Sequence, residues 1–285
     1  MIVHEDHNDG SESAYYPRIV LCVPGTWSDA AELAERLRAG PFRWTDSKLR
    51  AAEGPESFDA EFRGPDLRMK AAFQASACRV RPSLTSADYA AVQGHRSVAY
   101  VLSDNFGRST AAGAASRMID AGLALIEAGG IAVKCESSGI AHSAARWREL
   151  AARLRLGGGS GATRSDALEE RARAWAPLFD AYVRLPIIDD NKDLYSCGMH
   201  LLGASDAHVA LADFPGDDIA SAHRVLEGFL REFRNDLVPG RQELQRSFKP
   251  EGKDDRFLSV PEPCSRYPED AFFWNRWGCF RLRRA

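Results

Sequence analysis

The chain of 285 residues is 45% hydrophobic and 27% charged, with 37 basic and 40 acidic side chains. Such a chain is globular, with one large domain or two small ones, which excludes a disordered chain, collagen and a coiled coil. The near balance of charge also argues against a general nucleic-acid-binding protein, which is usually basic overall. We therefore expect no direct contact with nucleic acid.

The start of the chain and its cysteines indicate the compartment. Residues 1–13 carry four acidic side chains and neither lysine nor arginine, so they lack the basic start of a secretory signal and are interpreted as a disordered acidic tail. No stretch approaches the ~18 apolar residues of a membrane span. The six cysteines include no C-x-x-C pair, which is typical of free thiols in a reducing compartment. These features predict a cytoplasmic protein with no membrane partner.

The N-terminal half, residues 14–156, alternates strand-like and helix-like patterns. Ser97–Leu102 and Ile131–Cys135 predict buried strands, and Ala111–Ala128 predicts a long helix between them. Because no hairpin signal separates these elements, their order predicts a βαβ crossover between parallel strands. The other elements expected in this half are strands at Arg18–Val23 and Phe58–Phe62 and helices at Asp29–Ala39, Asp66–Ala77, Asp88–Gln93 and Ser143–Leu156.

The C-terminal half, residues 166–285, has a different pattern. It follows a glycine-rich loop or domain linker, residues 157–165, which lacks the residue order of a phosphate-binding loop. One long helix, Ile219–Phe233, lies among short apolar runs that predict a mainly antiparallel sheet. Those runs are Asp180–Ile188, Leu194–Leu202, Ala207–Leu211, Arg256–Val260 and Gly278–Leu282. The expected fold class is α/β (α+β): an N-terminal βαβ-containing half and a C-terminal mainly antiparallel sheet flanked by helices, with one continuous domain over 14–285 as the alternative.

One candidate catalytic set follows the strand that ends at Cys135. Cys135 with His142 offers a thiolate nucleophile and its base, and Glu136 would orient the imidazole. The carboxyl end of a parallel strand is where open α/β sheets bind ligands. The alternative is that Cys135 packs in the core and that Ser138-Gly139 forms a turn.

Two histidines in the second half are candidate metal ligands. His200 and His208 would converge with Asp206 across a hairpin around residues 203–205, in a set that suits a borderline metal such as zinc. Strand alternation would place Cys197 and His200 on opposite faces, which argues against pairing those two. The alternative is a hairpin with half-buried, hydrogen-bonded histidines, and we expect no resident metal or cofactor.

Acidic side chains dominate the stretch 186–218, where Lys192 is the single basic residue. Like charges in neighbouring loops repel each other, so the cluster is either a solvated face or the complement of a basic partner. Its members are Asp189, Asp190, Asp193, Asp206, Asp213, Asp217 and Asp218.

Aromatic residues crowd the C-terminus. Trp, Tyr and Arg dominate the hot spots of protein interfaces, so this cluster suits an interface anchor, and the alternative is a closing strand that packs its aromatic side chains into the core. The residues are Tyr267, Phe272, Phe273, Trp274, Trp277 and Phe280.

Several blocks together resemble a bacterial family of unknown function. They are Gly94-His95, the A-G-G-I-A-V-K-C-E-S-S-G-I-A-H-S block from Ala128 to Ser143, the S-C-G-M-H-L-L-G-x-x-D block from Ser196 to Asp206, Pro-Cys-x-x-Tyr from Pro263, and the closing Asn275 and Gly278. Some members of that family are immunity proteins encoded beside secreted toxins, including type VI secretion effectors. The resemblance covers most of Arg18 to Leu282, but its motifs are tied to no known chemistry, so it assigns no catalytic residue.

The resemblance implies a cytoplasmic immunity-type protein that binds a protein toxin, for example a basic nuclease, and neutralises it by occlusion. One alternative is a hydrolase or metal-dependent enzyme that uses Cys135, Glu136 and His142 with His200 and His208. Another is an adaptor or assembly module that docks through the C-terminal aromatic residues. The sequence does not indicate an oligomeric state.

Overall fold

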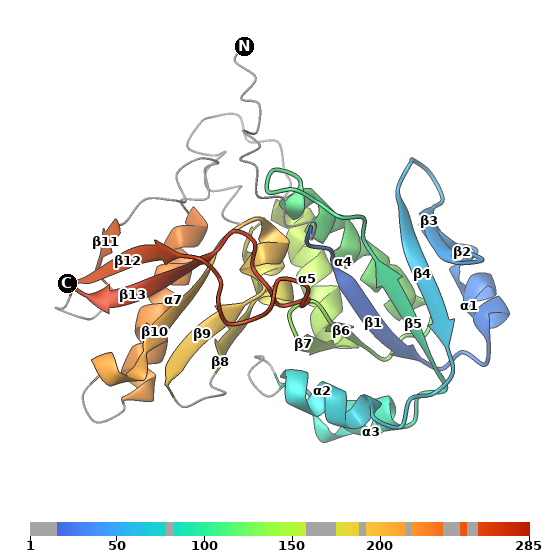
Figure 1. Ribbon diagram of the computed structural model, residues 1–285. Coiled ribbons are helices and arrows are strands. Elements are labelled where there is room, and N and C mark those ends of the chain that lie inside the picture. The colour runs from blue at the N-terminus through green and yellow to red at the C-terminus, as the bar shows by residue number, and fades with distance from the viewer. Residues whose placement is uncertain are drawn as a thin grey trace, which may run out of the picture.

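The computed structural model describes residues 16–77, 83–157, 175–187, 192–214, 218–235, 246–249 and 256–285. They form two β-sheets that lie side by side, with helices packed on them (Figure 1). The expected mixed α/β class is confirmed. The expected tail 1–13 and residues 158–165 of the expected linker lie outside the described residues.

The N-terminal sheet has seven strands in the order β2-β3-β4-β5-β1-β6-β7, and every neighbouring pair is antiparallel. In β4 (Ser57–Arg63), buried Phe58 and Ala60 alternate with exposed Asp59 and Glu61, as expected for a strand with one face on the core. The other strands are β1 (Val20–Gly25), β2 (Phe42–Thr45), β3 (Lys48–Ala51), β5 (Ser97–Leu102), β6 (Ala132–Cys135) and β7 (Ile140–Ser143).

Helix α4 (Ala111–Glu127) connects β5 to β6, as the sequence predicts, but β1 lies between those two strands. Both pair antiparallel with β1, so β5 and β6 run parallel to each other without being neighbours. Cys135, at the end of β6, therefore lies on a strand whose neighbours β1 and β7 are both antiparallel to it. The expected ligand-binding edge beside neighbouring parallel strands is absent at Cys135.

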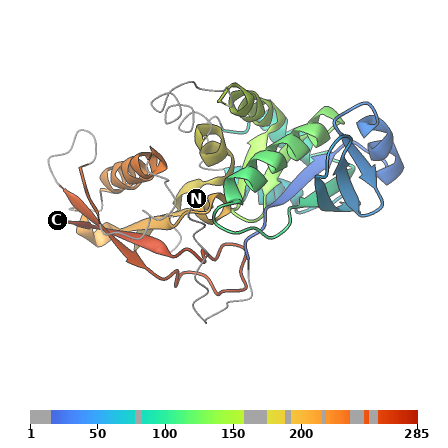
Figure 2. The ribbon, with the colours of Figure 1, turned by 90° about the horizontal axis from the view of Figure 1, so that it is seen from above.

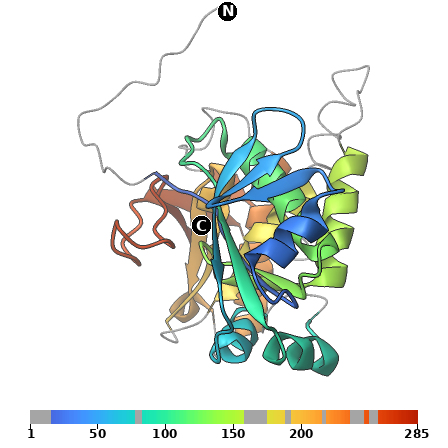
Figure 3. The ribbon, with the colours of Figure 1, turned by 90° about the vertical axis from the view of Figure 1, so that its right-hand side faces the viewer.

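Helices cover both faces of this sheet. Alternation along β1 directs Leu21 into a large core with α1 (Ala30–Leu37), α4 and α5 (Ala144–Gly157), whereas Cys22 faces a smaller cluster under α2 (Met69–Ala77) and α3 (Ser86–Gln93). Figure 3 shows α2 and α3 well apart from α4 and α5.

A capping box begins α3, because Thr85 accepts a hydrogen bond from the backbone of Asp88 while the Asp88 carboxylate accepts one from the backbone of Thr85.

The C-terminal sheet has six strands in the order β11-β12-β13-β10-β9-β8. Only the β10–β13 pair is parallel, which confirms a mainly antiparallel sheet. Helix α7 (Ile219–Asn235) packs against β8, β9 and β10. The strands are β8 (Arg184–Ile187), β9 (Asp193–Cys197), β10 (Asp206–Ala210), β11 (Arg246–Phe248), β12 (Phe257–Glu262) and β13 (Cys279–Arg284).

Two strand predictions in this half are wrong at one end. The chain is helical from 175 to 182, where a strand was expected from Asp180. The strand expected at Leu194–Leu202 ends at Cys197, and a 3₁₀ helix, η1 (Met199–Leu202), follows. Gly198 makes this break, since its φ of +116° belongs to the left-handed region that glycine enters without a steric penalty. His200 is therefore outside the strand, and the expected alternation with Cys197 does not apply.

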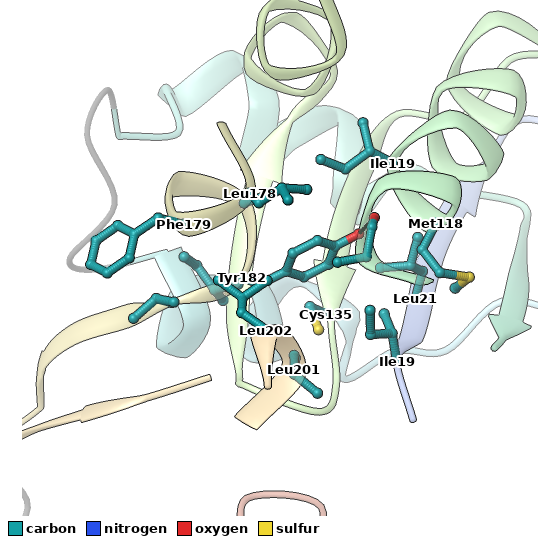
Figure 4. Close-up of a cluster of buried hydrophobic side chains, with 14 of the residues drawn as sticks. Ile19, Leu21, Met118, Ile119, Cys135, Leu178, Phe179, Tyr182, Leu201 and Leu202 are labelled. Atoms are coloured by element: carbon teal, nitrogen blue, oxygen red, sulfur yellow. Dashed lines mark hydrogen bonds between the residues drawn. The ribbon is translucent and has the colours of Figure 1, made fainter. Parts of the chain in front are cut away.

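One hydrophobic cluster draws residues from both sheets. Figure 4 shows Tyr182 between Met118 and Ile119 of α4 and Leu201 and Leu202 of η1. The Tyr182 hydroxyl donates a hydrogen bond to the backbone oxygen of Ala115 at 2.9 Å. The two halves thus share a core at their junction.

None of the helices in the described part of the chain is long and apolar enough to cross a membrane.

Candidate functional site

A cavity of about 350 Å³ lies on the C-terminal sheet, beside the chain that connects β12 to β13. We call that chain, residues 263–278, the β12–β13 segment; it reaches toward the N-terminal half, on the side opposite α5 (Figures 2 and 3). The cavity contains thiols, an imidazole and carboxylates, the groups that bind and react with ligands. It is lined by Asp193, Tyr195, Ser196, Asp206, Ala207, His208, Glu262, Cys264, Ser265, Arg266, Tyr267, Phe273 and Cys279.

A buried carboxylate anchors the inner wall of the cavity. Asp206 is only 6% exposed. Its Oδ1 accepts hydrogen bonds from the Ser196 hydroxyl at 2.8 Å and from the backbone of Met199 at 3.3 Å. Its Oδ2 accepts one from Nδ2 of Asn275 at 2.6 Å. Several donors to one carboxylate compensate for the cost of burying its charge.

The same network attaches the β12–β13 segment to the sheet. The ring Nε2 of His200 donates to the backbone oxygen of Phe272 at 3.1 Å, and the indole of Trp277 donates to the backbone oxygen of His200 at 3.3 Å. The Ser205 hydroxyl donates to the backbone oxygen of Trp277 at 2.7 Å. The segment therefore has a defined conformation set by side chains of η1 and of the start of β10.

Charged pairs form the outer part of the cavity. Nε2 of His208 lies 2.5 Å from Oε1 of Glu262, and Arg266 donates to the carboxylate of Asp193 at 2.8 Å. The Arg266 guanidinium also lies over the ring of Tyr195, 3.9 Å from its centroid. Glu262 and Asp193 thus each have a nitrogen partner, while the lining as a whole contains more carboxylates than guanidinium groups.

Two cysteines lie at the ends of the β12–β13 segment. Cys264 and Cys279 are both free thiols, both partly exposed, and both line the cavity. Hydrogen bonds from the Cys279 thiol and from the backbone of Asn275 and Arg266 lower the pKa of Cys264, while the same contact and burial raise the pKa of Cys279. The sequence does not indicate this pair, because fourteen residues separate the two cysteines and form no recognised motif. Its one signal is the Pro-Cys-x-x-Tyr block at Pro263.

An aromatic and cationic surface lies on the outer side of the segment. Phe272 is 41% exposed and Tyr16 is 43% exposed. The guanidinium of Arg276 lies over the Tyr16 ring, 4.1 Å from its centroid, and that of Arg18 lies 6.0 Å from the centroid of Phe272. We call these four residues, together with Trp277, the aromatic–arginine patch.

The chain matches no protein-family model. No curated protein and no solved structure is significantly similar to it either. The family suggested by the sequence blocks is thus a resemblance only.

The structure does not assemble the expected catalytic set. Cys135 is fully buried, and burial raises the pKa of its thiol to about 11, which disfavours a thiolate. The ring of His142 is also buried, donates to the backbone oxygen of Ala181 at 3.1 Å and lies tilted against Trp147, with 5.8 Å between the ring centroids. Glu136 forms an ion pair with Lys134. Among the described residues, no hydrogen bond joins Cys135, Glu136 and His142, so a packing role explains them.

The two candidate metal ligands lie in different surroundings. His200 contacts Phe272 and lies 3.8 Å from Asp206 through Nδ1, whereas His208 pairs with Glu262. Within the described ranges, no three His, Cys, Asp or Glu side chains are grouped so as to hold a metal ion. Both histidines are hydrogen-bonded, as the alternative given by the sequence expects, but His200 is 1% exposed and thus fully buried rather than half-buried.

Most described members of the acidic cluster are engaged within the protein. Asp193 pairs with Arg266, Asp206 is buried, and Asp218 accepts a hydrogen bond from the backbone of Ser221 at the start of α7. Asp213 lies partly exposed in a short 3₁₀ helix, η2 (Leu211–Asp213). Asp189, Asp190 and Asp217 are outside the described residues. The described aspartates therefore give little support to a continuous acidic binding face.

The C-terminal aromatic residues divide between the two expected roles. Phe280, on β13, is 2% exposed and belongs to the core. The others lie on the β12–β13 segment rather than on a strand: Tyr267, Phe272, Phe273, Trp274 and Trp277. The closing strand thus contributes one aromatic side chain to the core, and the segment before it presents the rest near the surface.

Proposed function

We propose that the protein is a cytoplasmic immunity-type protein that binds a protein toxin and neutralises it by occlusion, with the aromatic–arginine patch as its contact surface. The resemblance of the sequence blocks to a family that includes immunity proteins supports the toxin as partner. The observation that carries the contact surface is the stacking of Arg276 on exposed Tyr16 beside exposed Phe272.

The composition of the patch suits a protein interface. Aromatic and arginine side chains are enriched in hot spots, because they bury large areas and donate several hydrogen bonds. The hydrogen bonds of Phe272 and Trp277 to His200 and Ser205 hold the segment in one conformation before any partner binds. Preorganisation of this kind lowers the entropic cost of association.

The charge of the patch indicates the kind of surface it would contact. Arg18 and Arg276 give it positive charge, so an acidic or aromatic surface on the toxin is the complement. A basic nuclease would instead need the aspartates, and Asp193, Asp206 and Asp218 are engaged internally. The electrostatic attraction of a basic toxin thus depends on Asp213 and on the aspartates outside the described residues.

The test is binding to the candidate toxin, identified from the open reading frame next to this one or by co-purification from the native cell. We expect the double variant Phe272→Ala/Arg276→Ala to lower affinity by about 30-fold or more, since hot-spot truncations each cost over 1 kcal/mol. It should also lose protection of cells that express the toxin. Leu156→Ala is the matched control, because Leu156 is 84% exposed at the end of α5, on the opposite side of the molecule (Figures 2 and 3).

Two outcomes distinguish a wrong contact surface from a wrong function. If the double variant folds and binds like the wild type while Asp213→Lys weakens binding, the toxin uses the acidic side. If the wild-type protein neither binds nor protects against the neighbouring toxin, the immunity function is rejected.

A further inference from the structure

Cys264 and Cys279 are brought together by the pairing of β12 with β13. Glu262 is the register partner of Cys279, and Cys264 follows Glu262 by two residues, where the chain leaves the strand. Cys264 therefore lies diagonally across from Cys279 at the base of the β12–β13 segment, within reach of its side chain. Two cysteines separated by fourteen residues of the chain thus lie near each other in space.

The surroundings of the two sulfur atoms are unequal. The Cys279 thiol and the backbone N–H groups of Asn275 and Arg266 act as donors toward Cys264 and lower the pKa of its thiol to about 6. The contact with Cys264 and burial raise the pKa of Cys279, so Cys264 is the thiol that favours the thiolate form. The negative charge of Asp206 opposes a thiolate at both cysteines, and that of Glu262 opposes one at Cys279.

Both sulfur atoms line the 350 Å³ cavity, and this separates them from the other described cysteines. Cys22, Cys135 and Cys197 are buried in hydrophobic clusters, and burial raises the pKa of each thiol. Reactive cysteines are those with thiolate character and access to solvent. Among the described cysteines, the Cys264–Cys279 pair combines these properties.

We infer that Cys264 and Cys279 form a peroxide-responsive dithiol, in which Cys264 is the nucleophile and Cys279 is the resolving thiol. The Cys264 thiolate attacks one oxygen of hydrogen peroxide: the S–O bond forms, the O–O bond breaks, and the leaving hydroxide takes a proton from solvent to give water. The Cys279 sulfur then attacks the sulfenic acid: the S–S bond forms, the S–O bond breaks, and the hydroxide leaves with the proton released by Cys279. Two thiols are oxidised to one disulfide, and one peroxide is reduced to two waters.

The charge of the cavity favours a small neutral oxidant. The lining carries three carboxylates, those of Asp193, Asp206 and Glu262, and one guanidinium, that of Arg266, so it is acidic on balance. An acidic cavity repels anionic disulfides such as glutathione disulfide and admits hydrogen peroxide. The disulfide would tie together both ends of the β12–β13 segment, but the inference does not rest on the proposed function, because it concerns the purified protein alone.

Peptide mapping of the full-length protein tests this reaction. The reduced protein is treated with hydrogen peroxide at pH 7, blocked with N-ethylmaleimide and digested with trypsin, which cleaves after Arg256, Arg266, Arg276 and Arg281. We expect peptide Phe257–Arg266 linked to Trp277–Arg281 by a bond that dithiothreitol reverses. The linked pair should form about tenfold faster in the native protein than in urea, because unfolding removes the donors that stabilise the thiolate.

Two variants assign the roles. In Cys279→Ser, dimedone should trap a sulfenic acid on Cys264 and no disulfide should form; in Cys264→Ser, Cys279 should remain unmodified at the same dose. Cys135→Ala is the matched control and should form the linked pair at the wild-type rate. The inference is overturned if the wild-type protein yields no linked pair, if Cys264 pairs with another cysteine, or if Cys264 is alkylated no faster than Cys135.

Discussion

Asn275 donates a hydrogen bond through Nδ2 to Oδ2 of Asp206 at 2.6 Å, across 69 positions of sequence. The same amide also donates to the backbone oxygen of Ala204 at 3.0 Å. The Ser196 hydroxyl completes the other side of the carboxylate. Ser196 and Asp206, the two ends of one sequence block, thus form a buried polar network with Asn275 of another block, and this network fastens the β12–β13 segment to the sheet.

Removal of the Asp206 carboxylate should destabilise the protein. Asp206→Ala leaves the Ser196 hydroxyl and one of the two N–H groups of the Asn275 amide without an acceptor, and each buried unsatisfied donor costs about 1–3 kcal/mol. We expect the free energy of unfolding, measured by urea denaturation, to fall by about 3 kcal/mol. Asp213→Ala, at a partly exposed position, should change it by less than about 0.5 kcal/mol. Equal stabilities of the two variants would contradict a structural role for Asp206.

The break between β9 and η1 gives a second prediction. A Cβ on Gly198 would lie 2.1 Å from the backbone oxygen of Tyr182, and its φ of +116° disfavours any other residue. We expect Gly198→Ala to lower the free energy of unfolding by more than about 3 kcal/mol, or to prevent folding. Gly107→Ala is the matched control, since no atom lies within 4 Å of its added Cβ, and its effect should stay within about 1 kcal/mol.

Local sequence patterns predicted which residues form helices and strands better than they predicted which strands are neighbours in the sheet. The runs at Ser97–Leu102 and Ala111–Ala128 give a strand and a helix close to those of the structure, because hydrophobic periodicity is a local property. The insertion of β1 between β5 and β6 depends on pairing across the chain, which no local pattern encodes. The same limit explains the site: Cys264 and Cys279 meet only through the register of β12 with β13.

Expectations about chemistry were less reliable than those about structure. Cys135 and His142 have the residue types of a catalytic pair, but their reactivity depends on burial, which the sequence indicates only as an apolar run. The acidic cluster looked like one surface because seven aspartates lie within a short stretch. Folding separates Asp193, Asp206 and Asp218 into an ion pair, a buried network and a helix cap, since each side chain points where its own element directs it.

The buried imidazole of His142 should make stability depend on pH. Burial lowers its pKa from 6.5 to about 4, so between these values the unfolded chain binds a proton that the folded protein does not. Stability from this residue is complete above pH 6.5 and is lost as pH falls toward 4. We expect His142 to account for about 2 kcal/mol of the loss between pH 8 and pH 5.

The measurement compares urea denaturation of the wild type and His142→Gln at pH 8 and pH 5. Glutamine keeps a side-chain donor for the backbone oxygen of Ala181 but does not titrate, and the other histidines contribute equally to both proteins. The variant should therefore lose about 2 kcal/mol less than the wild type over this interval. A parallel loss in both proteins would mean that His142 is not buried in its neutral form.

Access to the Cys135 thiol decides between packing and catalysis at the end of β6. Its sulfur lies among hydrophobic side chains of the core in Figure 4, and its side chain is fully buried. N-ethylmaleimide should therefore modify Cys135 only when the protein unfolds, so its rate should rise with urea in parallel with the unfolding equilibrium. Cys135→Ala should cost about 1–2 kcal/mol of stability and leave binding to the proposed toxin unchanged. Rapid alkylation of Cys135 in the native protein, or loss of the proposed toxin binding in a stable Cys135→Ala variant, would instead favour a functional thiol there.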